Sequence, residues 1–188
     1  MNHRSSTDPT NFGGWKGCDL RYDILGSTNV APSGYGSVVT TSRVGYDASD
    51  TCATSPVPGT LMAALPSELR AVMKPMTIYT DNTGGGTNTA SNVTSSVDYL
   101  PLLAEFEIFG TRSNANSAEQ NYQAQYAYYS AGNSKVKYRH SATSSTAGWC
   151  ERSPFYDGSS NFCRVSTNGD ASNLTAWHSL GLAPAFRV

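Results

Sequence analysis

Charged side chains are scarce in this sequence and form no cluster of one sign. Asp, Glu, Lys and Arg make up 14% of the 188 residues, and the formal net charge is −1. No basic stripe supplies the attraction to phosphates that dominates nucleic-acid binding, so no nucleic-acid partner is expected. No apolar run approaches the roughly 20 residues of a spanning helix, so no membrane insertion is expected.

The beginning of the chain lacks the apolar segment of a secretory signal. Residues 1–4 (MNHR) are followed by polar residues rather than by apolar ones. The sequence therefore predicts no secretion signal and places His3 at a loose chain end. If the protein works outside a cell, we expect it to get there by another route, such as lysis or as part of a particle.

Motifs of catalytic and metal sites are missing as well. The chain has three His and contains no HExxH, GxSxG, Walker or GxGxxG pattern. Glu105 and Glu107 are two residues apart in a helical segment, where they point to different sides, so we interpret them as structural or solvated carboxylates. The sequence thus predicts a binding protein rather than an enzyme, with no metal and no cofactor.

The chain has four cysteines, Cys18, Cys52, Cys150 and Cys163, whose spacing matches no zinc or CxxC motif. We interpret them as small buried side chains with free thiols. A bridge between Cys150 and Cys163 stays open as an alternative if their segments are neighbouring strands.

Ser, Thr, Asn and Gly take the place of the missing charge, which favours long hydrogen-bonded loops over a helical bundle. Helical patterns predict a helix at 18–25, two short helices within 58–73, a helical turn at 104–109 and a helix at 119–131. Strands are predicted at 74–80, 97–103, 135–139, 149–153, 162–166 and 183–188, and residues 27–58 are expected to be an irregular surface stretch. Together these patterns predict one α+β domain over residues 1–188, with short helices, small antiparallel sheets and long displayed loops.

Residues 149–181 place aromatic side chains inside otherwise polar loops. Phe155, Tyr156 and Trp177 stand among Ser, Asn, Asp and Gly. That mixture is typical of protein surfaces that bind other molecules, because rigid aromatic rings supply contact area and short polar groups supply adaptable hydrogen bonds. The alternative interpretation is a polar surface loop with incidental aromatics.

The sequence resembles the C-type-lectin-fold variable domains of phages and gut bacteria, which are ligand-binding proteins diversified by retroelements. It also resembles a related domain of unknown function found in phage tail and prophage proteins. The most specific matches lie at the C-terminal end, and weaker blocks precede them in the expected order. The matching segments are 11–16 (NFGGWK), 20–21, 65–66, 69–70, 72–75, 100–103, 107–110, Trp149, 152–154 (RSP), 161–162 (NF), Val165, 168–169 (NG) and 181–187 (GLAPAFR).

This resemblance implies a C-type lectin fold, with both chain ends held close in a small sheet and a hypervariable region at about 149–181. The variable, ligand-contacting positions would be Phe155, Tyr156, Asp157, Arg164, Asp170, Ser172, Leu174, Trp177 and His178. The fixed scaffold would be Trp15, Trp149, Arg152, Phe162, Val165, Pro184 and Phe186, with Arg152 as an ion-pair or backbone-bonding residue. Many relatives carry Trp and Leu where this chain has Cys150 and Glu151, which marks these two as altered or variable positions.

Retroelement diversification rewrites adenines, often in asparagine codons, and this offers a check within the sequence. Changes in the first two bases of an asparagine codon cannot give Trp, Glu, Lys, Gln or Met. Between Phe155 and Leu180 only Trp177 falls outside the reachable set. The composition of this stretch is therefore compatible with such a history.

The function implied is ligand or receptor binding, for phage host recognition or surface attachment. The partner would be a host-surface protein or glycan, and the setting a virion tail or a bacterial cell surface. A homotrimer or attachment to a larger tail protein would be the form in which it acts. Two alternatives stay open: a fixed structural tail or decoration domain of a phage particle, and a formylglycine-generating-type oxidase that uses Cys150 and Cys163.

Overall fold

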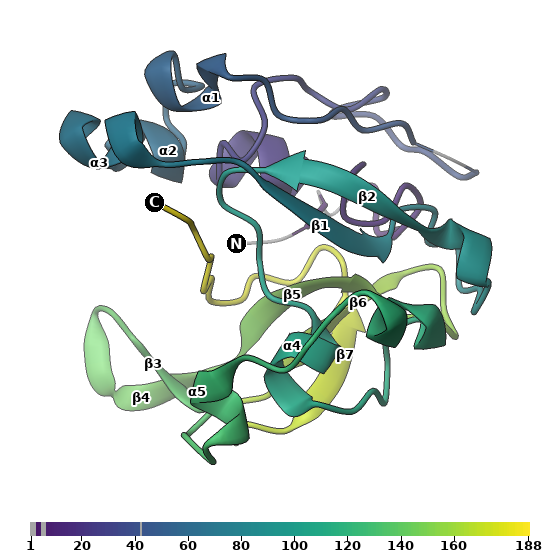
Figure 1. The fold of residues 1–188 in the computed structure, drawn as a ribbon. Helices are drawn as coiled ribbons and strands as arrows, with labels where there is room; N and C mark the ends of the chain where they lie inside the picture. Colours follow the sequence, from purple (N-terminus) through teal and green to yellow (C-terminus); the bar gives the residue numbers. More distant parts are fainter. Residues whose placement is uncertain (1–2, 5–6, 42) are drawn as a thin grey trace.

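The structure is a computed structural model that describes residues 3–4, 7–41 and 43–188. It has short helices and small antiparallel sheets, which confirms the α+β prediction. Figure 1 shows two halves, with α1 to α3 and the β1–β2 hairpin in one and α4, α5 and β3 to β7 in the other. The C-terminal segment runs from the second half back to the first (Figure 1).

The first half begins with a helical turn, η1 (Leu20–Ile24), followed by α1 (Thr51–Thr54), α2 (Leu61–Ala64) and α3 (Ser67–Val72). The two short helices predicted within 58–73 are confirmed as α2 and α3. Thr60 caps α2, because its hydroxyl accepts a hydrogen bond from the N–H of Ala63 at 3.3 Å. Pro66, which cannot continue a helix, separates α2 from α3.

The stretch predicted to be an irregular surface, residues 27–58, also contains a buried ionic cluster. The guanidinium of Arg43 binds the carboxylates of Asp8, at 2.9 Å, and Asp19. It also donates to the carbonyl oxygens of Gly34 and Ser37. The sequence prediction was incomplete here, because an arginine that pairs with two carboxylates can be buried within an irregular segment.

A hairpin of β1 (Met76–Asp81) and β2 (Val93–Asp98) follows, with the short helix η2 (Ala90–Asn92) before its second strand. The strand predicted at 97–103 was wrong beyond its first two residues, because β2 ends at Asp98. Leu102, beyond the end of β2, pairs with other segments instead. It forms a single bridge with Pro184, and its carbonyl accepts a hydrogen bond from Arg152 at 2.8 Å.

The second half contains α4 (Glu105–Phe109), η3 (Ser117–Asn121) and α5 (Ala127–Ser130). The turn at 104–109 is confirmed as α4, but the continuous helix predicted at 119–131 was wrong. Residues between η3 and α5 instead bind α4. The N–H of Tyr126 donates to the Glu107 carbonyl at 2.9 Å, and the side-chain amide of Gln125 donates to the Ile108 carbonyl. These bonds to a distant element replace the helical bonds.

Two further sheets complete this half. β3 (Lys137–Arg139) pairs with β4 (Ala142–Ala147), and β5 (Trp149–Pro154), β6 (Asn161–Val165) and β7 (Ala171–Thr175) form an antiparallel sheet in that order. The strands predicted at 135–139, 149–153 and 162–166 are confirmed as β3, β5 and β6. β4 and β7 were not predicted, because their sequences are small and polar.

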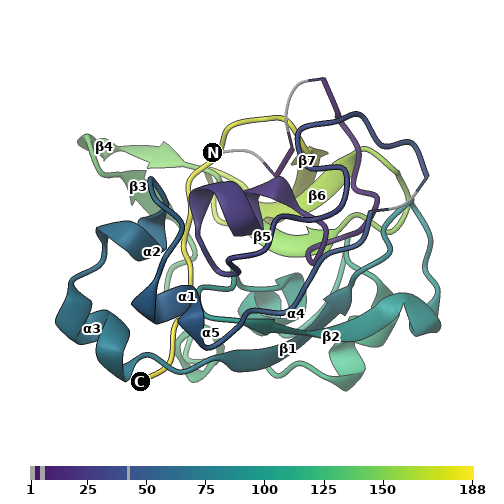
Figure 2. The same ribbon diagram turned by 90° about the horizontal axis from the view of Figure 1, so that it is seen from above.

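The strand predicted at 183–188 was wrong. This segment forms only isolated bridges, Leu102 with Pro184 and Lys74 with Arg187. Phe186, expected in the scaffold, is 49% exposed. Seen from above, the C-terminal segment runs past α1 and α2 (Figure 2).

The described part of the N-terminal segment is not a loose end. His3 is buried, its ring stacks on Phe162 with centroids 3.9 Å apart, and its Nε2 lies 2.7 Å from the Glu151 carbonyl. The N–H of Arg4 donates to the carbonyl of Ala176. Within residues 3–4, 7–41 and 43–188, the two ends are therefore paired with different segments and not with each other, contrary to the expectation of a shared sheet.

Buried apolar side chains form two clusters, of which the larger joins the two halves and the smaller lies within the second half. The larger one includes Trp15, Leu20, Met62, Leu102 and Cys150, and the smaller one is formed by Ile108, Tyr129, Trp149 and Val165. In the part of the chain that the structure describes, no helix has the length and apolar character needed to cross a membrane.

Candidate functional site

One end of the β5–β6–β7 sheet carries most of the residues predicted to bind a ligand. At this end β5 finishes at Pro154, β6 begins at Asn161 and β7 finishes at Thr175. The β5–β6 loop (155–160) and the segment after β7 (176–178) therefore lie side by side, joined by the N–H of Ala176 donating to the Ser160 carbonyl at 2.8 Å. We call these two segments the loop end.

The buried side chain of Asn11 holds the backbone of the β5–β6 loop. Its Nδ2 lies 2.8 Å from the carbonyl oxygens of Gly158 and Asn161 and 3.3 Å from that of Phe155. Its Oδ1 accepts from the N–H of Gly85 at 2.8 Å, and its own N–H donates to Ser159. A loop held through its backbone leaves its side chains free for other contacts.

The glycines at 84–86 pack closely against Asn11 and the β5–β6 loop. A Cβ on Gly84 would lie 2.0 Å from the Asn11 carbonyl oxygen, and one on Gly86 would lie 3.0 Å from the backbone of Gly158. Both have positive φ, +64° and +72°, which favours glycine. This run therefore serves close backbone packing against the loop.

A second support comes from residues 112–114, which sequence reasoning missed. The N–H of Tyr156 donates to the Asn114 carbonyl at 3.0 Å, and the side chain of Asn173 donates to the Asn114 side chain at 2.9 Å. The guanidinium of Arg112 lies over the Tyr156 ring, 4.6 Å from its centroid. Nothing in the local sequence pattern pointed to these contacts, because about 40 residues separate the two segments.

Glu105 fixes that support in place. It is fully buried, and its carboxylate accepts the backbone N–H groups of Ser113, Asn114 and Ala115 at 2.7 to 3.0 Å. The interpretation of Glu105 as structural is therefore confirmed. It orders the neighbouring turn rather than meeting solvent.

Glu107 is structural as well, and it pairs with Arg152. The Arg152 guanidinium donates to both Glu107 carboxylate oxygens, at 2.6 and 2.7 Å, and its Nε donates to the Thr80 hydroxyl at 2.7 Å. All three side chains are buried. The predicted role of Arg152 as an ion-pair and backbone-bonding residue is confirmed.

None of the nine candidate ligand-binding side chains is buried, whereas the scaffold residues of β5 and β6, which we call the frame, are buried. Asp157, Asp170 and Trp177 are exposed, and the other six are partly exposed. Trp149, Arg152, Phe162 and Val165 are all at most 2% exposed. The proposed frame and the proposed contact residues thus separate by burial along the same strands.

Position in the sheet divides the nine residues into three groups. The loop end brings together Phe155, Tyr156, Asp157, Trp177 and His178. Asp170 lies in the β6–β7 turn, at the opposite end of the sheet. Arg164, Ser172 and Leu174 lie along β6 and β7 on the face that also carries Phe162, part of which His3 covers.

Trp177 and His178 form an ordered pair at the loop end. Their rings stack with centroids 4.1 Å apart, and Nδ1 of His178 contacts the hydroxyl of Thr175. The Trp177 side chain is 41% exposed. A large ring held in one orientation at the surface provides contact area with little loss of conformational freedom on binding.

Cys150 and Glu151, marked by the sequence as altered or variable, are fully buried and cannot contact a ligand at the surface. Burial raises the pKa of Cys150 to about 12 and the pKa of Glu151 well above its usual range. Both side chains are therefore neutral parts of the interior.

The four cysteines are free and buried, as predicted. Cys150 lies opposite Arg164 in the register of β5 and β6, so Cys163, one residue away, points to the other face of the sheet. Burial raises the pKa of Cys163 well above its usual range too, which disfavours the reactive thiolate. In residues 3–4, 7–41 and 43–188, no group of three or more His, Cys, Asp and Glu is placed to hold a metal ion.

Comparison with known proteins gives one result. No curated protein and no solved structure matches the chain. The family described as "Domain of unknown function (DUF6273)" matches residues 2–188, nearly the whole length. The chain therefore belongs to the DUF6273 family.

Proposed function

We propose that this protein is a ligand-binding module of C-type lectin fold whose loop end contacts a protein or glycan on a host surface. In this proposal a retroelement changes the exposed side chains, and the protein serves phage host recognition or surface attachment. The α+β architecture and the resemblance of segments such as 181–187 to those of diversified variable domains support it. The setting would be a virion tail or a bacterial cell surface.

The observation that carries the proposal is the separation of frame and surface in residues 149–178. Trp149, Phe162 and Val165 fill the interior, and the Asn11 side chain holds the loop by its backbone carbonyls. Side chains at the loop end, by contrast, make few contacts that the fold requires. An arrangement of this kind tolerates changes in the exposed residues without loss of the fold.

Binding would rest on aromatic anchors surrounded by polar groups, the usual composition of energetic centres in protein interfaces. Tyr156 and Trp177 are the anchors, with Asp157 and His178 beside them along the chain. A single copy would bind weakly. A trimer, or several copies on a larger tail protein, would raise the overall affinity by about 100-fold or more without new contacts.

Sequencing the gene across a population of its host tests this proposal. We expect a nearby reverse transcriptase, a near-copy of the last coding segment, and substitutions at adenine-matched positions. These substitutions should fall on the codons of loop-end residues such as Tyr156 and Asp157 and spare those of Trp149 and Phe162. A lone gene without such a copy would contradict the proposal and favour a fixed structural tail or decoration domain.

A further inference from the structure

A groove lies at the end of the β5–β6–β7 sheet opposite the β5–β6 loop and contains residues that the sequence did not single out. It has a volume of about 760 Å³ and lies between the β3–β4 hairpin, β6 and residues 179–182. Gly148, Trp149 and Gly181 belong to its lining, and Trp149 and Gly181 are joined as a parallel bridge. Its volume lies within the range typical of small-molecule sites.

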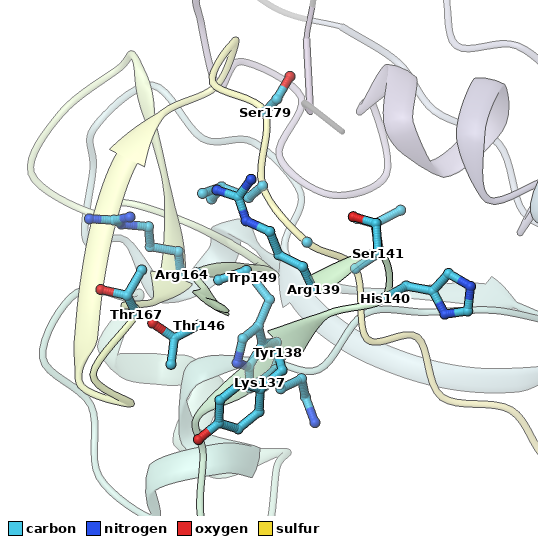
Figure 3. A pocket seen from close by; sticks show the side chains of 15 residues that line it. Lys137, Tyr138, Arg139, His140, Ser141, Thr146, Trp149, Arg164, Thr167 and Ser179 are labelled. Carbon is cyan, nitrogen blue, oxygen red and sulfur yellow. The ribbon is translucent and has the colours of Figure 1, made fainter. Parts of the chain in front are cut away.

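Three consecutive residues of β3 line the groove: Lys137, Tyr138 and Arg139. The register of β3 and β4 shifts between Tyr138 and Arg139, which marks an irregularity in the hairpin beside the groove. Figure 3 shows Arg139 directed toward the C-terminal segment that carries Ser179, whereas His140 points away from it.

The groove is positively charged. Lys137, Arg139 and Arg164 line it, with His140 at its edge, and no Asp or Glu is among the lining residues. In the part of the chain that the structure describes, none of these three cations forms an ion pair with a carboxylate. The excess charge is local, since the whole chain carries a formal net charge of −1.

The interior arginines show what a structural role looks like in this protein. Arg21 pairs with Asp98 at 2.6 Å, Arg43 with Asp8 at 2.9 Å and Arg152 with Glu107 at 2.6 Å. Arg164 differs from them because, within the described residues, it forms no ion pair with a carboxylate. An arginine without a carboxylate partner leaves its guanidinium available to a bound anion.

The packing around Gly148 places the Arg164 guanidinium at the groove. A Cβ on Gly148 would lie 3.3 Å from Nη1 of Arg164 and 3.5 Å from Cδ2 of Leu180. Glycine at this position therefore lets Arg164 lie against the backbone. Its planar guanidinium is suited to the paired oxygens of a carboxylate.

The remaining lining groups suit a sugar. Hydroxyl groups of Ser141, Thr146, Thr167 and Ser179 can donate to and accept from sugar hydroxyls. The Tyr138 ring, 57% exposed, offers a flat apolar face to the ring of a pyranose. We propose that this groove binds an acidic sugar, with Arg139 and Arg164 holding its carboxylate and the hydroxyls and Tyr138 contacting its ring.

This site goes beyond the proposed loop-end function, because it lies elsewhere on the sheet and has its own ligand chemistry. A titration of the ¹⁵N-labelled protein with D-glucuronate, followed by amide chemical shifts, tests it. D-Glucose is the matched neutral probe, and D-glucose 6-phosphate is the anion without a carboxylate. We expect saturable shifts at Gly148, Thr167 and Gly181 with glucuronate, none with glucose, and weaker binding of the phosphate.

The variants Arg139→Gln and Arg164→Gln should each weaken glucuronate binding about tenfold, since each removes a charged hydrogen-bond donor. Lys74→Gln removes the same charge at an exposed position outside the groove and should bind like wild type. Arg139 is exposed, so its variant is expected to fold. Absent saturation with glucuronate, equal binding of glucose, tighter binding of the phosphate, or wild-type affinity in both arginine variants would each overturn the proposal.

Discussion

Two buried glutamates, Glu107 and Glu151, differ in what surrounds their carboxyl groups. Glu107 accepts two hydrogen bonds from Arg152, whereas neither carboxyl oxygen of Glu151 has a hydrogen-bond partner among the described residues. An ionised carboxylate without partners is strongly disfavoured in the interior, so burial raises the pKa of Glu151, and the nearby Glu105 carboxylate raises it further. The folded protein therefore keeps Glu151 protonated.

The protonation of Glu151 makes stability depend on pH in a defined direction. At pH values below the ordinary carboxyl range, the folded and unfolded chains both carry this proton. As the pH rises, the unfolded chain releases this proton first. The free energy of unfolding therefore falls until the pH reaches the raised pKa of Glu151 in the folded state. We expect Glu151→Leu to unfold at higher urea concentration than wild type, with a difference that grows from about pH 5 to about pH 8.

Glu151→Gln is the control for that measurement. It places a neutral amide of the same shape at the same buried position, so its stability should follow the pH curve of Glu151→Leu at a lower level. Other buried acids, such as Glu119 with a pKa raised to about 7, are present in all three proteins and cancel in the comparison. Parallel curves for wild type and Glu151→Leu would show that residue 151 does not change its protonation on unfolding.

At the scale of elements, the β5–β6 loop depends on a side chain from outside it. Asn11 supplies hydrogen bonds to the carbonyl groups of Gly158 and Asn161 and is itself fully buried. Asn11→Ala leaves these carbonyls without a donor and should lower the free energy of unfolding by about 2 to 4 kcal/mol. Amide hydrogen exchange in residues 155–161 should accelerate more than exchange in β1 and β2.

Asn11→Asp is the matched control for the loop. It keeps an oxygen that can accept from Gly85 but has no amide hydrogens to donate to the loop. Its loop exchange should therefore be as fast as that of Asn11→Ala. If either variant were destabilised while loop exchange stayed at the wild-type rate, Asn11 would not be what holds the loop.

Elements with strong local patterns could be predicted from the sequence. The leucine spacing and Pro66 predicted α2 and α3, and aromatic and β-branched residues predicted β5 and β6. β4 (ATSSTA) and β7 (ASNLT) could not be found this way, because pairing with their neighbours rather than intrinsic preference makes them strands. The break within 119–131 also arises from distant bonds, those of Tyr126 and Gln125 to α4.

The same limit applies to the candidate site. Phe155, Tyr156 and Trp177 could be identified because an aromatic ring in a polar loop is visible in the sequence alone. Asn11, Arg112 and Asn114 could not, since their importance comes from contacts across the fold. The groove residues Lys137 and Arg139 lie on β3 and Arg164 lies on β6, and only Arg164 was among the predicted positions.

At the scale of the whole molecule, the β5–β6–β7 sheet separates two surfaces. The loop end presents Tyr156, Trp177 and His178 next to a backbone that Asn11 and Asn114 hold. The groove with Arg139 and Arg164 lies toward the β3–β4 hairpin. The buried side chains of Trp149 and Phe162 lie between the two surfaces. Because they hold the backbone under both, the exposed side chains of either surface can change without altering the fold.

The thermal unfolding midpoint of the triple variant Tyr156→Ala, Trp177→Ala and His178→Ala tests this central claim most directly. If these side chains serve binding and not folding, the midpoint should fall by less than about 4 °C, as expected for a loss near 1 kcal/mol in a chain of this length. The same variant should lose binding to the host-surface ligand. A fall of about 10 °C or more, as for removal of buried aromatic side chains, would place these residues in the core and contradict the account.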